Sequence, residues 1–170
     1  MSDMSQVVPS VIPPSTDDKQ QQAALEMAKF QVKAGIKSSA NWFYWIAGLS
    51  LVNTGAAMAG STWRFLIGLG ITQVVDAIAD RLGQTGHVAA FIVDLFIAGI
   101  FVLLGWLAGK NKRWAFVVGM VLFSLDALIF LIGPDIIGIV FHVYCLFWLF
   151  KGYQLVGKLR ILEPEPRQGF

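Results

Sequence analysis

The chain has 170 residues, of which 56% are apolar and 14% are charged, and its mean hydropathy is +0.64. This composition excludes an ordinary soluble globular protein and predicts an all-α integral membrane protein. The formal net charge of +2 is too small to favour nucleic acid as a partner, and the single cysteine, Cys145, excludes a disulfide framework.

The first forty residues divide into an arm and a helix. Residues 1–16 contain three prolines, so we expect a flexible N-terminal arm, and they lack the basic and apolar regions of a cleavable signal peptide. Ser15 or Thr16 can cap the helix that follows. Its apolar residues share one stripe, made of Leu25, Ala28, Val32 and Ile36. This pattern predicts an amphipathic helix over 17–38 at the membrane surface, or a solvated helix that leads into the first membrane segment.

Four apolar segments follow, each near the roughly 20 residues that a helix needs to cross hydrocarbon: residues 42–60, 88–109, 114–132 and 136–156. The segment 63–81 differs, because its apolar stretch is interrupted by four polar residues, Arg64, Gln73, Asp76 and Asp80. We therefore expect a helical membrane domain over 41–158. It is a bundle of four transmembrane helices plus one helix, within 63–81, that is either membrane-embedded or a fifth spanning helix.

Basic residues indicate the orientation of this bundle. One cluster lies at 110–113 and another at 151–160, two crossings later, so the positive-inside rule places both clusters and the exposed C-terminal tail, 159–170, in the cytoplasm. Four crossings also place Lys29, Lys33 and Lys37 in the cytoplasm, whereas five crossings place them outside. We favour four and keep five as the alternative for this multi-pass protein.

Four ionisable residues lie inside the membrane segments, where a charge at a helix centre costs roughly 2.5–3.5 kcal/mol: Asp76, Asp94, Asp126 and His142. Asp126 precedes Pro134 by eight residues and His142 follows it by eight, so the two are level in an antiparallel hairpin. We predict that their side chains meet directly or through one water. A second linker, 83–87, centres near residue 85, with Asp76 nine residues before it and Asp94 nine after it, so these two are also level if the segment 63–81 is inserted. Two crossings separate the two turns, which therefore lie on one side of the membrane. The sequence thus predicts one intramembrane polar layer of these four residues. Small residues share the helical stripes of Asp94 and His142, so we expect these two stripes to face other helices.

Two interpretations of this layer follow from its chemistry. Three carboxylates and an imidazole can bind a proton or a hard cation. Alternatively, Asp126 and His142 pair with each other, Asp94 bonds a neighbouring hydroxyl or amide, and Asp76 reaches water. We favour this second, structural interpretation and predict no metal and no cofactor.

No enzyme motif is present, since the chain has no HExxH, GxSxG or P-loop sequence. We therefore expect a non-enzymatic accessory, assembly or scaffold subunit of a membrane complex, with the lipid bilayer and other membrane chains or further copies of itself as partners. The alternative is a proton- or cation-coupled transporter or channel that uses the Asp/His layer. An intramembrane enzyme acting on lipid ranks below both, because no nucleophile arrangement is recognisable.

Overall fold

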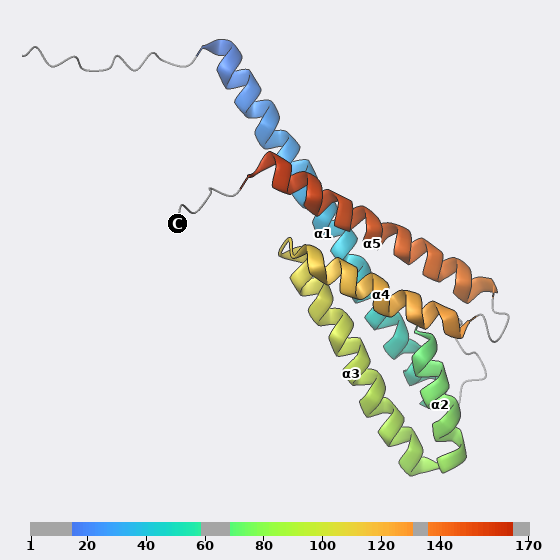
Figure 1. Cartoon of the computed structure of the whole chain (residues 1–170). Helices are drawn as coiled ribbons and strands as arrows, with labels where there is room; N and C mark the ends of the chain where they lie inside the picture. Colours follow the sequence, from blue (N-terminus) through green and yellow to red (C-terminus); the bar gives the residue numbers. More distant parts are fainter. Residues whose placement is uncertain (1–14, 59–68, 131–135, 165–170) are drawn as a thin grey trace, which may run out of the picture.

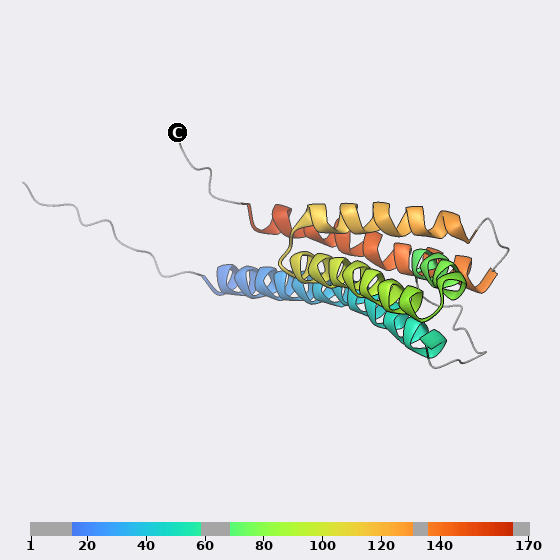
Figure 2. The same cartoon turned by 90° about the horizontal axis from the view of Figure 1, so that it is seen from below.

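The computed structural model describes residues 15–58, 69–130 and 136–164, and every regular element in these ranges is an α-helix. The helices are α1 (Thr16–Met58), α2 (Gly70–Leu82), α3 (Gln84–Gly109), α4 (Arg113–Ile129) and α5 (Ile136–Leu162). In Figure 2, α4 and α5 form one layer, α1 and α3 form the other, and the short α2 lies at one end of the bundle. The predicted all-helical bundle is confirmed for the described residues.

Helix α1 is continuous over 43 residues. The amphipathic helix expected over 17–38 and the first apolar segment are therefore parts of a single helix, because no proline interrupts the chain between them. Ser15 and Asp18 cap its start reciprocally, since the Asp18 N–H donates to Ser15 Oγ at 3.2 Å and the Ser15 N–H donates to Asp18 Oδ2 at 3.0 Å. The first turns of α1 extend beyond the bundle (Figure 1).

The reversal between α2 and α3 is tighter than the sequence predicts. Gly83 alone separates the two helices, with φ +70°, a conformation open to glycine. Residues 84–87, expected as part of a linker centred near residue 85, belong to α3 instead. Asp76 is therefore seven residues before the turn and Asp94 eleven after it, so the equal spacing assumed for these two residues is wrong.

The helices differ in whether they are long enough to cross a membrane. Among the described residues, Val88–Gly109 and Ile136–Leu162 are long and apolar enough to cross a membrane, with mean hydropathies of 2.6 and 1.6. Helix α2 has only 13 residues, which corresponds to about 20 Å, less than the roughly 30 Å of a hydrocarbon core.

One level of the core is aromatic. We call Phe43, Phe101, Phe116 and Phe123 the aromatic layer; all four are buried, and the rings of Phe43 and Phe116 have centroids 5.9 Å apart. Phe43 packs directly on Gly119 and Phe116 directly on Gly152, where a Cβ atom would overlap the ring. Glycine at these two positions lets large rings fill the space between close helices.

The helix faces that carry small residues point inward, as the sequence predicts. On α3, Ala90, Asp94, Ala98 and Ala108 are buried, and on α5 so are Gly138, His142, Cys145 and Gly152. Phe147, on the other side of α5, is 62% exposed.

Candidate functional site

Asp126 and His142 form a direct contact between α4 and α5. His142 Nε2 lies 2.9 Å from Asp126 Oδ2, which confirms the contact predicted from their equal distance to the turn. Both residues are buried, with exposed fractions of 6% for Asp126 and 1% for His142. The imidazole also stacks on Phe123, with ring centroids 4.2 Å apart. The pair is thus held within the core and away from water.

The second ring nitrogen of His142 faces an acceptor as well. Nδ1 lies 2.7 Å from the carbonyl oxygen of Gly138, one helical turn earlier. A neutral imidazole carries a single N–H and can donate to only one of these two oxygens. Both ring nitrogens of His142 therefore have an oxygen partner, one on α5 and one on α4.

The N-terminus of α2 supplies the other partners of Asp126. The Gly70 N–H donates to Oδ2 at 2.7 Å, and the Ile71 N–H donates to Oδ1 at 2.8 Å. The first N–H groups of a helix have no partner within it, and they form the positive end of its dipole. Leu69, the N-cap residue, provides no side-chain cap. A carboxylate from α4 thus caps α2, and these donors stabilise its negative charge.

Gly70 packs closely against α4 beside this capping contact. A Cβ atom at residue 70 would lie 2.7 Å from Phe130 Cε2 and 3.3 Å from Ile129 Cβ. A larger residue there requires the Phe130 ring or the start of α2 to shift.

Helix α1 joins the same arrangement through two hydroxyl groups. The Leu69 N–H donates to Ser50 Oγ at 2.9 Å, and Ser50 in turn donates to the Ile46 carbonyl at 2.9 Å. One turn further, Thr54 Oγ1 donates to Asp94 Oδ2 at 2.7 Å. Asp94, on α3, is completely buried, so this bond provides a polar partner where water does not reach.

The buried polar groups therefore connect all five helices. We call this set the polar network: the side chains of Ser50, Thr54, Asp94, Asp126 and His142 with the backbone of 69–71. Asp94 and Asp126 belong to it through different partners, on α1 and α2 respectively, rather than through each other. Asp76 lies in α2, but its side chain is outside the described part of the structure, as is that of Asp80.

Sequence reasoning missed five members of the network, Ser50, Thr54, Leu69, Gly70 and Ile71. The sequence pattern could have identified Ser50 and Thr54, because two hydroxyl residues one turn apart in an apolar segment share one helix face. Gly70 and Ile71 act through backbone N–H groups, which carry no side-chain pattern. Their role depends on where α2 begins, inside a segment that reads as continuously apolar.

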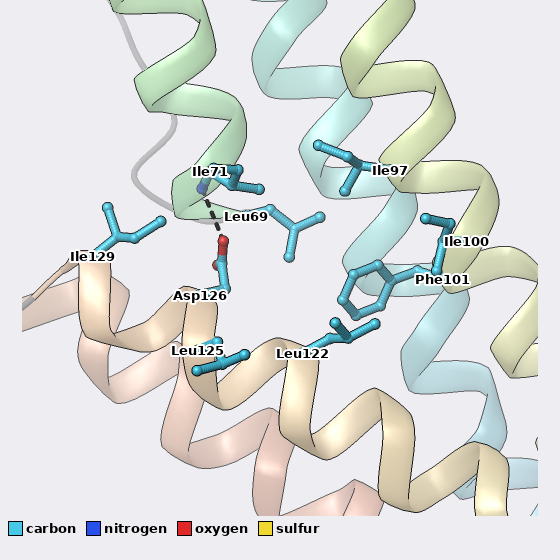
Figure 3. Close-up of a pocket in the computed structure, with 9 residues that line it drawn as sticks. All are labelled: Leu69, Ile71, Ile97, Ile100, Phe101, Leu122, Leu125, Asp126 and Ile129. Atoms are coloured by element: carbon cyan, nitrogen blue, oxygen red, sulfur yellow. Dashed lines mark hydrogen bonds between the residues drawn. The ribbon is translucent and has the colours of Figure 1, made fainter.

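A cavity of about 390 Å³ lies beside the network, between the start of α2, α3 and α4. Figure 3 shows its lining, which consists of Leu69, Ile71, Ile97, Ile100, Phe101, Leu122, Leu125, Asp126 and Ile129. Asp126 is the single polar side chain in this lining. The two carboxylate oxygens already accept hydrogen bonds from Gly70, Ile71 and His142.

The geometry of the polar network fits a structural contact between helices better than a site for a metal ion. Within the ranges that the structure describes, no group of three or more His, Cys, Asp or Glu side chains is arranged to hold a metal. Asp126 accepts hydrogen bonds from two backbone N–H groups and contacts His142 Nε2, so both of its oxygens have partners within the core. In comparisons with protein-family models, curated proteins and solved structures, no match to this chain was found.

Proposed function

We propose that this chain is a small multi-pass membrane protein that serves as a non-enzymatic accessory, assembly or scaffold subunit of a membrane complex. One observation carries the proposal: the buried Asp126 carboxylate is engaged by α2 and by His142. A group committed to three partners on two other helices holds helices in place, whereas a transport site needs a group that exchanges its partners. The intramembrane charge is thereby explained as part of the structure.

Membrane insertion is supported by the outer surface of the bundle. Large apolar side chains are exposed along α3, α4 and α5, among them Phe96, Leu125 and Phe147. In water such a surface would drive aggregation, whereas in a bilayer it is the expected lipid-facing surface.

The positions of the helix ends support four membrane crossings, with α2 as a short helix embedded in the membrane. The start of α1, the turn between α3 and α4 and the end of α5 lie at one end of the bundle (Figure 1). Lys33 of α1 bonds Glu163, just after α5, with Nζ to Oε1 at 2.8 Å. The two basic clusters and the lysines of α1, Lys29, Lys33 and Lys37, therefore share one end, which we assign to the cytoplasm.

The start of α1 is the segment that we assign to partner binding. It extends past the bundle (Figure 1), and it carries Leu25, Met27 and Phe30 in exposed positions. Phe30 is 69% exposed. Apolar side chains on a projecting helix fit a groove or another helix on a second protein.

Isolation of the full chain from its native membranes in mild detergent tests this assignment. We expect a second protein in fixed stoichiometry on native gels, lost when Leu25, Met27 and Phe30 are replaced by serine. The matched control replaces Gln20, Gln21 and Gln22, also exposed on this helix, by serine and should retain the partner. If wild type and both variants migrate as the same isolated chain, the accessory role is refuted.

A proton-coupled transporter is the second candidate, because Asp126 lines a cavity. Full-length protein in liposomes that contain a pH-sensitive dye distinguishes the two functions. The accessory role predicts proton flux equal to that of protein-free liposomes. Flux that requires Asp126, and that Asp126→Asn abolishes while the variant remains folded, would favour the transporter.

A further inference from the structure

The two basic clusters meet in one hollow at the end of the bundle opposite the polar network. The hollow has a volume of about 720 Å³ and lies between the turn that joins α3 to α4 and the end of α5. Its lining consists of Lys110, Asn111, Lys112, Val156, Leu159, Arg160, Glu163 and Pro164. Residues some fifty positions apart in the sequence thus form a single surface.

Positive charge dominates this hollow. Lys110, Lys112 and Arg160 are exposed cations, and the one carboxylate in the lining, Glu163, is already bonded to Lys33 of α1. Three cations around one hollow attract an anion, and the pairing of Glu163 with Lys33 limits the repulsion from its carboxylate.

The backbone adds to this preference. In the turn, the N–H groups of Lys110 and Asn111 donate to carbonyl groups of the last turn of α3, at distances of 3.0–3.2 Å, and thereby satisfy its negative end. Helix α4 begins at Arg113, next to Lys112, and Lys112 provides no side-chain cap. The positive end of the α4 dipole therefore lies beside the hollow.

The floor of the hollow is apolar, and aromatic residues flank it. Val156 and Leu159 are buried beneath the cations. Lys110 Nζ lies 3.6 Å from the centroid of the Trp106 ring, and both Trp106 and Trp114 are exposed at this end. Tryptophan at this level is typical of the headgroup region of a bilayer. A ligand with a charged part and an apolar part matches the hollow better than a simple anion.

We propose that this hollow binds the headgroup of an anionic phospholipid, with the phosphate among Lys110, Lys112 and Arg160 and the glycerol region over Val156 and Leu159. The inference rests on the membrane insertion proposed above and is independent of the accessory role. The bound lipid fixes the turn between α3 and α4 to the end of α5, because both segments supply cations to the same phosphate.

Lipid binding to the full chain in neutral detergent tests the proposal. The probes are phosphatidylglycerol, phosphatidylcholine and inorganic phosphate, and the measurements are native mass spectrometry and the shift in unfolding temperature. Lys110→Gln, Lys112→Gln and Arg160→Gln are combined in one variant. The matched control, with Lys19→Gln, Lys29→Gln and Arg81→Gln, removes two lysines and one arginine that line no part of the hollow.

We expect saturable binding of phosphatidylglycerol to wild type and control, and at least about tenfold weaker binding to the hollow variant, since each basic residue near a lipid surface contributes severalfold. The binding should also weaken as salt is raised. Glu163→Gln removes the carboxylate and should tighten binding about two- to fivefold. This gain cannot come from a variant that fails to fold.

Several outcomes would overturn the proposal. Equal binding of phosphatidylcholine, or equal loss in the control, would show that the hollow does not select the headgroup. A shift by inorganic phosphate as large as that by phosphatidylglycerol would show a site for a free anion. Flotation with phosphatidylcholine vesicles separates this failure from the failure of membrane insertion. A chain that floats with the vesicles but does not select phosphatidylglycerol contradicts the headgroup site alone. A chain that does not float contradicts membrane insertion as well.

Discussion

The aromatic layer and the polar network occupy successive levels of one core, and they join where Phe123 stacks on His142. In the aromatic layer, rings pack on glycines of neighbouring helices, so shape determines the fit. In the polar network, each contact has a donor and an acceptor at 2.7–2.9 Å. Lipid tails are as apolar as the side chains, so close packing and hydrogen bonds are what hold helices together in a bilayer.

The comparison shows a division of tasks between the two levels. Rings on glycines bring α1, α3, α4 and α5 close together. The network positions the start of α2, a helix of 13 residues, against α1 and α4. Substitutions in each level, with matched controls, measure how much each contributes.

The largest effect is expected for Asp126→Ala. It leaves His142 and the N–H groups of Gly70 and Ile71 without their acceptor in the core, and the loss of one partner of a buried pair costs about 3–5 kcal/mol. Asp126→Asn keeps an acceptor oxygen and should cost less. The free energy of unfolding in mixed micelles measures both, and equal losses would mean that the hydrogen bonds at Asp126 do not position α2.

Thr54→Val tests the other buried carboxylate. The variant keeps the shape of Thr54 but removes the donor to Asp94 Oδ2, and a hydrogen bond to a charged group contributes about 1.5–3 kcal/mol. Thr54→Ser, the control, retains the hydroxyl. The free energy of unfolding, followed by circular dichroism, should be lower for Thr54→Val than for Thr54→Ser. The reverse order would contradict a stabilising hydrogen bond between α1 and α3.

Gly119→Ala tests the aromatic layer. The added methyl group overlaps the Phe43 ring, and overpacking of a filled core costs about 1–3 kcal/mol. Gly99→Ala is the control, since nothing lies within 4 Å of the new methyl group there, and alanine should stabilise this helix by about 0.5–1 kcal/mol. Melting temperatures that shift in the same direction for both variants would refute the close fit of Phe43 on Gly119.

The smallest effect is expected for Lys33→Gln, outside both levels. The bond from Lys33 to Glu163 is 2.8 Å long, but both side chains are partly exposed, and such pairs contribute less than about 1 kcal/mol. The same unfolding measurement in low and high salt gives the contribution of this exposed ion pair to the free energy of unfolding, as a reference for the buried contacts. A loss as large as that of Thr54→Val would show that the contact between α1 and the end of α5 stabilises the bundle as much as a buried hydrogen bond in its core does.

The sequence alone determined the helical class, the inward faces of α3 and α5, and the contact between Asp126 and His142. These features follow from local rules. Helical periodicity places small residues on one face, and equal spacing from a short turn brings two residues of adjacent helices to one level. Each rule needs only residues that are near in the chain or joined by one turn.

The tertiary structure decided the rest. The sequence does not show that α1 is continuous or that the chain between α2 and α3 reverses at Gly83 alone, and this second fact shifts the expected depths of Asp76 and Asp94. Nor does it show which groups reach Asp126 and Asp94, because the donors are the backbone of α2 and a hydroxyl of α1. A buried carboxylate must find donors, but the choice among them depends on which helix ends come close once the core is packed, and that choice is made by contacts between segments far apart in the chain.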